Sequence, residues 1–160
     1  MAATMLKAIR RAVVGALDGA QADARSAPAQ ERRQLQVAVA MLLHEARRAD
    51  YGEDNEESRA ALAGLADLFA LEPGECAALL EEGRARAEQH TSFYAPVALI
   101  KREFSLDERI HLVEHLWRIS FVDGELSLYE DHYVRKIAHL LYVPNTQSML
   151  ARNRARSSAG

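Results

Sequence analysis

Apolar residues recur at helical spacing along most of the chain, with polar residues between them. Residues 4–18 carry a stripe of apolar side chains from Met5 to Leu17 on one helical face, and their basic side chains lie off that face. Residues 31–49 differ, because apolar side chains occupy most sides of that predicted helix. A helix without a polar face has no side to offer to water, so we expect it in the centre of a bundle.

Helix-start signals divide the rest of the chain. Three segments place Asp or Ser three residues before Glu, the spacing of a capping box: Asp54 to Glu57, Ser105 to Glu108, and Ser127 to Glu130. Pro73 suits the first turn of a further helix, and Asn145 or Thr146 can cap a short last one. The composition also favours helices, since 49% of residues are apolar and the chain has 4 Pro and 8 Gly. We predict an all-α, compact bundle of about seven to eight helices.

The two halves of this pattern resemble each other. Asp50 precedes Glu57 by seven positions, and Asp123 precedes Glu130 by the same number. Each half reads as a long helix with Asp at its end, a tight loop, and a capped helix. The sequence therefore predicts a degenerate internal helix-loop-helix duplication.

Charge is unevenly distributed and suggests three regions. Residues 1–33 carry 6 basic and 3 acidic side chains, whereas residues 34–150 carry 11 basic and 20 acidic ones. We predict an N-terminal amphipathic helix and linker over 1–30, a helical domain over 31–150, and a basic tail over 151–160. An acidic body argues against nucleic acid binding and is compatible with a cation or a basic protein partner.

The single cysteine, Cys76, excludes an intramolecular disulfide and fits a reducing compartment. No apolar run is long enough to span a bilayer, and no signal peptide is evident at the N-terminus. We expect a cytoplasmic protein. The basic, amphipathic N-terminal helix leaves peripheral contact with an acidic membrane open as an alternative.

Three segments resemble the tellurite-resistance TerB-like family. They are LLHEARRADYGEDNEE (42–57), FSLDERIHLVEHLWRISFVDGELSLYE (104–130) and VRKIAHLLYVP (134–144). The resemblance covers roughly residues 35–150 in family order and spacing. It implies a compact, all-helical bundle that is linked to tellurite and chemical-stress resistance, with acidic residues that would hold a metal. The sequence departs from the family pattern at Tyr51, Glu53 and Tyr142, where Gly, an aliphatic residue and Gly are usual.

The stretch Asp123-Gly124 to Glu130 resembles the second half of an EF-hand loop, but the first half is missing. With Asp123 as the fifth loop position, Ile119 and Phe121 fall where oxygen ligands are needed, so this is not an EF-hand. Glu57 and Glu130 also have a purely structural interpretation. As the last members of capping boxes they can return hydrogen bonds to the backbone without any metal.

Asp50 and Asp123 favour a cation site all the same. Both are predicted at helix C-termini, where the helix dipole disfavours an anion by roughly 0.3–1 kcal/mol, so each carboxylate needs a compensating partner. If the two loops face each other, several carboxylates could converge on a hard cation. The predicted ligands are Asp50, Asp54, Glu57, Asp123, Glu130 and Glu45. Oxygen ligands favour calcium or magnesium over zinc.

The segment His111-Leu-Val-Glu114-His115 matches the H-x-x-E-H signature of inverted zincins. A zinc peptidase needs a third protein ligand, normally a downstream Glu, and the only such residues are Glu125 and Glu130 in the acidic loop. We therefore interpret the two histidines as incidental and keep a metal-dependent hydrolase only as an alternative. The main expectation is a non-enzymatic, stress-associated module that binds a divalent cation, a protein partner, or both.

Overall fold

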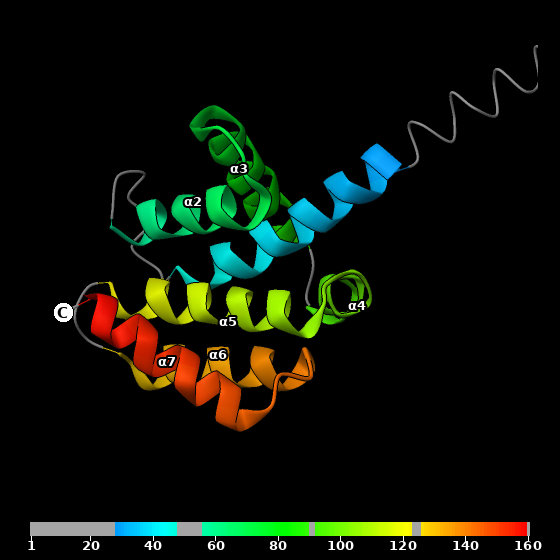
Figure 1. Ribbon diagram of the computed structural model, residues 1–160. Helices are drawn as coiled ribbons and strands as arrows, with labels where there is room; N and C mark the ends of the chain where they lie inside the picture. The colour runs from blue at the N-terminus through cyan, green and yellow to red at the C-terminus, as the bar shows by residue number, and fades with distance from the viewer. Residues whose placement is uncertain (1–27, 48–55, 90–91, 123–125, 160) are drawn as a thin grey trace, which may run out of the picture. The chain divides into compact units, whose positions relative to one another are not determined.

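The computed structural model describes residues 28–47, 56–89, 92–122 and 126–159 (Figure 1). These residues form a helix over 28–46, followed by α2 (Glu56–Phe69), α3 (Pro73–Gln89), α4 (Tyr94–Glu103), α5 (Leu106–Phe121), α6 (Leu128–Leu140) and α7 (Asn145–Ala159). The part of the chain so described contains no strand, which confirms the all-α prediction. The chain divides after Gln34, and the packing given below is that of the unit that begins at Leu35.

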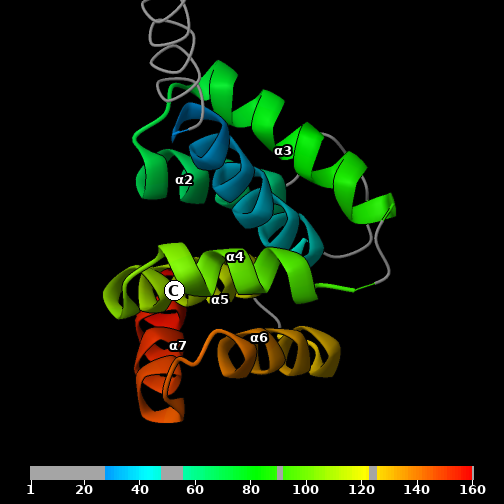
Figure 2. The ribbon, with the colours of Figure 1, turned by 90° about the vertical axis from the view of Figure 1, so that its right-hand side faces the viewer.

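Residues 35–46 form a buried helical segment, as the apolar run from Val37 to Leu43 predicts. Every residue from 36 to 44 is buried. The segment lies between the α2–α3 pair and α5 in both views (Figures 1 and 2). Gly83 of α3 allows this close packing, since a Cβ there would stand 2.7 Å from the Cβ of Ala40. Tyr133 of α6 approaches the same segment and donates a hydrogen bond to the carbonyl of Leu42 at 2.8 Å.

Helix α5 packs against α2, α6 and α7. It begins with the predicted capping box, because the Ser105 hydroxyl accepts from the Glu108 amide and the Glu108 carboxylate accepts from the Ser105 amide. Its residues 112–117 and 119–121 are buried, with Trp117 completely so. Burial on nearly all sides makes α5 a fixed support for the side chains at its exposed edge.

Helix α7 corrects the expectation of a short last helix. It continues through Ala159, so most of the segment predicted as a basic tail is helical. Ala151 and Ala155 are fully buried one turn apart, which lets α7 lie closely on its neighbours. Small alanines among arginines give only a weak apolar signal, and the sequence pattern alone therefore ended the helix too early.

Helix α6 ends in a Schellman motif. The amide of Val143 donates to the carbonyl of Ala138 at 2.9 Å, and the amide of Tyr142 donates to the carbonyl of His139 at 3.0 Å. Tyr142 takes a left-handed backbone with φ 56°. The exposed tyrosine ring at this turn is thus fixed by the backbone.

The loops of the predicted duplication fall largely outside the described residues, at 48–55 and 123–125. The duplication therefore stays a prediction. No helix among the described residues is long and apolar enough to cross a membrane.

Candidate metal centre

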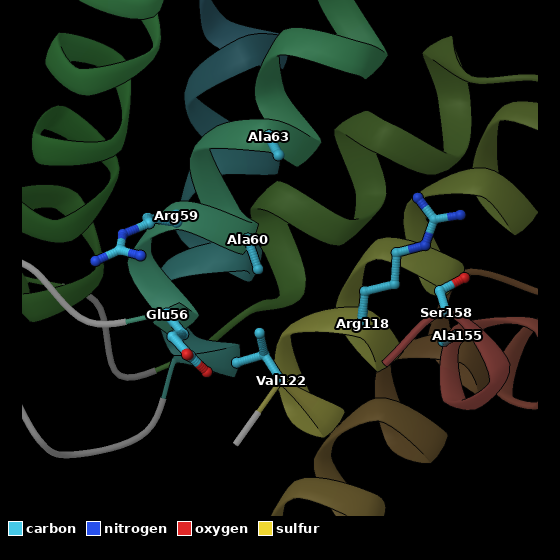
Figure 3. A pocket seen from close by; sticks show the side chains of 8 residues that line it. All are labelled: Glu56, Arg59, Ala60, Ala63, Arg118, Val122, Ala155 and Ser158. Carbon is cyan, nitrogen blue, oxygen red and sulfur yellow. The ribbon is translucent and has the colours of Figure 1, made fainter. Parts of the chain in front are cut away.

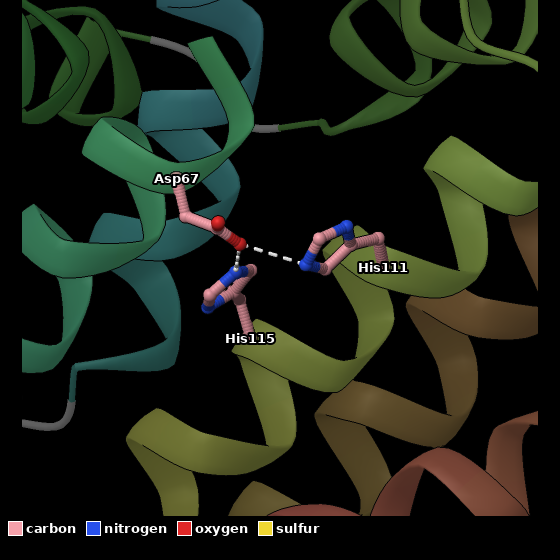
Figure 4. Close-up of side chains that lie close together, drawn as sticks. All are labelled: Asp67, His111 and His115. Atoms are coloured by element: carbon pink, nitrogen blue, oxygen red, sulfur yellow. Dashed lines mark hydrogen bonds and ion pairs between the residues drawn. The ribbon is translucent and has the colours of Figure 1, made fainter. Parts of the chain in front are cut away.

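Asp67, His111 and His115 bring three metal-ligand side chains together between α2 and α5 (Figure 4). The Nε2 atoms of His111 and His115 each lie 2.7 Å from the same carboxylate oxygen, Oδ2 of Asp67. One ligand atom from each residue lies within 4.8 Å of the other two. Because a carboxylate only accepts hydrogen bonds, each Nε2 carries the hydrogen that points to Asp67.

Helix geometry explains why the two imidazoles meet. His111 and His115 are four residues apart on α5 and therefore share one face. Their rings stack with centroids 5.1 Å apart and planes inclined by 15°. The third ligand, Asp67, comes from α2. Gly64 stands one turn before Asp67 and makes room for the His115 ring. A Cβ at Gly64 would stand 3.3 Å from Cγ of His115, so the missing side chain lets the ring lie against α2.

The three side chains differ in exposure, and the difference gives the cluster an inner and an outer side. The His115 side chain is 4% exposed, whereas those of His111 and Asp67 are 47% and 48% exposed. A dissolved ion can therefore reach the cluster from solvent. The buried imidazole at the same time holds one ligand in a fixed position.

The electrostatics set the protonation states that a metal ion requires. The hydrogen bond from His115 is the main cause that lowers the pKa of Asp67, with the nearby imidazoles adding to it. Burial lowers the pKa of His115. The hydrogen bond to Asp67 raises it, and the charges of Arg118 and His111 lower it further. At neutral pH the cluster thus offers an ionised carboxylate and a neutral buried imidazole, which are the forms that coordinate metals.

Two imidazoles and one carboxylate are a donor set for borderline transition metals such as zinc. In tetrahedral coordination at about 2.0–2.1 Å, neighbouring ligand atoms lie roughly 3.3 Å apart. To hold a metal through Nε2, each imidazole would have to carry its proton on Nδ1 instead, and the two Nε2–Oδ2 distances of 2.7 Å would have to widen by about half an ångström. Rotation of the two half-exposed side chains can supply that change.

Glu114, the acidic residue of the H-x-x-E-H segment, belongs to a different contact. It is buried and pairs with Arg154 of α7 and with Arg118 of α5. Its carboxylate is thus engaged with guanidinium groups and is not part of the histidine cluster. The segment therefore lacks the geometry of a zinc peptidase, although its histidines do gain a third ligand.

The acidic residues predicted as ligands are only partly described. Asp50, Asp54 and Asp123 lie outside the described residues. Glu57 and Glu130 are buried in the first turns of α2 and α6, and Glu45 is half-buried. The amide of Glu130 donates to the Ser127 hydroxyl at 3.1 Å, as the capping prediction requires. Metal binding by this set stays a prediction.

Arg47 links the end of the helix over 28–46 to α2. Its guanidinium donates to the Ser58 hydroxyl at 2.7 Å and to Nδ1 of His44 at 2.5 Å. Burial lowers the pKa of Arg47, and the negative charge of Glu57 acts against that effect. Among the described ligand candidates, Glu57 is thus one whose charge Arg47 offsets.

A separate pocket of about 500 Å³ lies between α2, α5 and α7 (Figure 3). Alanines and Val122 form much of its lining, and Arg59 and Arg118 stand on opposite sides of it. Both guanidinium groups point away from the middle of the pocket (Figure 3). They do not converge on a common anion, so the pocket offers no built anion site.

Sequence reasoning missed Asp67. The residue lies in an ordinary amphipathic segment, and 48 positions separate it from His115. The His111–His115 spacing is visible in the sequence, but the H-x-x-E-H signature predicts a downstream Glu as the third ligand. In the structure α2 packs on α5, and this packing brings the upstream residue Asp67 to the two histidines.

A protein-family model, described as tellurite resistance protein TerB, matches residues 36–153. A search of curated proteins found no match, and neither did a search of solved structures. The matched range includes the candidate metal centre and, among the described residues, the whole of helices α2 to α6. Since the match covers more than half of the chain, this protein belongs to the TerB tellurite-resistance family.

Proposed function

We propose that this chain is a non-enzymatic TerB-family module of tellurite and chemical-stress resistance that binds a divalent transition-metal ion. Asp67, His111 and His115 are the ligands. The observation that carries the proposal is the convergence of both Nε2 atoms on one carboxylate oxygen at 2.7 Å. Zinc is the best candidate, because two imidazole nitrogens favour it over calcium or magnesium.

The surroundings support binding rather than hydrolysis. Three protein ligands leave at least one coordination position for water, which a catalytic zinc site also needs. Hydrolysis would further require a base next to that water. Glu114 is held by Arg118 and Arg154, and among the described residues within the cluster Asp67 is the only carboxylate. That carboxylate is itself a ligand, so we assign the site to binding.

The predicted acidic set provides a second candidate site for a hard cation. The buried carboxylates of Glu57 and Glu130 favour it, because each stands in the first turn of a helix that follows one of the predicted loops. Together with Glu45, Asp50, Asp54 and Asp123 they would take calcium or magnesium through oxygen ligands. The two proposals differ in both the metal and the residues involved, and a metal panel separates them.

Isothermal titration of the full chain with zinc, cobalt, calcium and magnesium tests both. We expect one zinc or cobalt ion to bind and the affinity to fall at least tenfold in Asp67→Asn and in His115→Gln. Bound cobalt(II) should show the intense visible absorption of four-coordinate geometry. His139→Gln, an exposed histidine of α6, is the matched control and should bind as the unaltered chain does.

Two outcomes would decide against the histidine site. One is equal zinc binding by the unaltered chain and Asp67→Asn. The other is a preference for calcium that is lost in Asp123→Asn but kept in His115→Gln, which would favour the acidic set instead.

A further inference from the structure

A groove between α4 and the end of α6 is lined by lysine and aromatic side chains. Its volume is about 470 Å³. The chain has three lysines, and two of them, Lys101 and Lys136, line this groove. Tyr94 and Tyr142 line it as well, and they are 80% and 69% exposed. Aromatic rings with a small number of charged groups on one concave surface are typical of a binding site.

The two lysines are available to a ligand. No ion pair joins either ammonium group to a carboxylate in the described part of the chain, although the protein is acidic as a whole. Lys101 instead lies over the ring of Tyr142, with 4.1 Å from Nζ to the ring centroid. The contact holds the ammonium and the ring together at one end of the groove.

Tyr142 stands at the groove at an energetic cost. Its φ of 56° lies in the left-handed region, which glycine occupies far more easily than a residue with a bulky side chain. A Schellman turn needs this backbone but not a tyrosine. The turn therefore holds an exposed aromatic ring where glycine would be better for the fold, and such a cost points to a use of the ring.

The floor of the groove is rigid. Phe93 packs edge-on against Tyr133, with ring centroids 6.1 Å apart, and the Tyr133 hydroxyl is bonded to the carbonyl of Leu42. Val97 of α4 is buried beside them. A ligand would thus meet a preformed surface and would not have to order it.

We propose that this groove binds a short acidic peptide segment of a partner protein. An apolar side chain of the peptide packs between Tyr94 and Tyr142, and its flanking carboxylates pair with Lys101 and Lys136. Two lysines beside exposed rings fit a peptide that carries both kinds of group, whereas a free anion would leave the rings uncovered. The net charge of −3 and the small size of the groove disfavour a nucleic acid.

The test uses the full ¹⁵N-labelled chain and a defined six-residue peptide, with central leucine and phenylalanine flanked by two glutamates and two aspartates. A matched peptide carries amides in place of the four carboxylates. We expect amide shifts at Tyr94, Lys101 and Tyr142 with the acidic peptide. Binding should weaken at least tenfold for the amide peptide, and for Lys101→Gln and Lys136→Gln with the acidic one. Arg86→Gln, which removes a charge from α3 outside the groove, should bind normally.

Tyr142→Gly separates a binding role from a structural one. If the ring serves the ligand, this variant keeps or raises the melting temperature and loses at least fivefold in peptide affinity. Ala70→Gly is the matched control, because Ala70 also has a left-handed backbone, with φ 53°, but does not line the groove. It should gain stability and bind as before.

Several results would overturn the proposal. They are equal binding of the amide peptide, shifts confined to other helices, or no binding at millimolar peptide. Binding to phosphatidylglycerol vesicles that the peptide does not displace would indicate a membrane surface instead. A rise in mass with concentration in sedimentation, abolished by Lys136→Gln, would indicate a second copy of the chain.

Discussion

The Nε2 atom of His115 on α5 lies 2.7 Å from Oδ2 of Asp67 on α2, and this contact joins two helices that are far apart in the sequence. The imidazole is buried and the carboxylate is half exposed. A buried donor on one helix thus fixes a solvent-facing acceptor on the other. This arrangement holds the three side chains close together even before any ion binds.

Zinc should stabilise the protein at neutral pH and lose that effect in acid. A ligand that binds only the folded state at a hundredfold excess over Kd adds about 2.7 kcal/mol to the free energy of unfolding. Protons compete with the metal for the imidazole nitrogens, so the increase should shrink as pH falls from 7.5 to 5. Thermal melts with zinc or EDTA at both pH values measure it. The same zinc effect in Asp67→Asn would exclude the carboxylate as a ligand.

Gly64→Ala should weaken metal binding without unfolding the protein. The new Cβ would stand 3.3 Å from the His115 ring, so the imidazole must move by a few tenths of an ångström. Alanine is better than glycine inside a helix by about 1 kcal/mol, which offsets the crowding. We expect apo stability within about 1 kcal/mol of the unaltered chain and a severalfold loss of zinc affinity. Unchanged affinity would show that the ring position is not set by this contact.

Gly83→Ala should destabilise the protein clearly. Its Cβ would stand 2.7 Å from the carbonyl carbon of Ala40 and 2.9 Å from the amide nitrogen of Met41, and backbone atoms cannot move aside as a flexible side chain can. The expected loss is about 1–3 kcal/mol in urea unfolding, despite the better helix propensity of alanine. Gly74→Ala is the control, because nothing lies within 4 Å of its new Cβ. Equal stability of both variants would contradict the close approach of α3.

Stability should fall in mild acid because of His44. Burial lowers its pKa to about 4, and the charges of Arg47 and Arg84 act in the same direction, against Glu88 and Glu81. The unfolded chain takes up a proton near the ordinary pKa of 6.5, but the folded chain resists it. The contribution of neutral His44 to the free energy of unfolding is therefore complete above pH 6.5. It is lost as pH falls towards 4, by on the order of 2–3 kcal/mol.

Urea melts at pH 7, 5.5 and 4.5 measure this dependence. His44→Gln should flatten the curve over that range, whereas His139→Gln, on the exposed side of α6, should leave it unchanged. His115 contributes in the same direction, since burial also lowers its pKa. A profile that keeps its full slope in His44→Gln would assign the acid sensitivity elsewhere.

The sequence predicted the helices well where a local signal exists. The Ser105–Glu108 capping box and Pro73 mark helix starts through interactions that span only three or four residues, and the structure confirms both. The buried stretch from 36 to 44 lies within the central helix predicted over 31–49, because seven of its nine residues are apolar and cover most sides of the helix. The end of α7 was predicted less well, since alanines pack closely without raising the apolar signal.

By itself, the sequence determined the all-α class, most helix starts and the TerB resemblance, all of which depend on local patterns or ordered motifs. Only the tertiary structure decided which polar residues meet. The packing of α2 on α5 places Asp67 beside two histidines, and the packing of α7 on α5 brings Arg154 to Glu114. Both are set by the fit of buried side chains over the whole bundle. A contact between residues 48 positions apart has no local pattern, because helical periodicity fixes the face of each helix but not its partner.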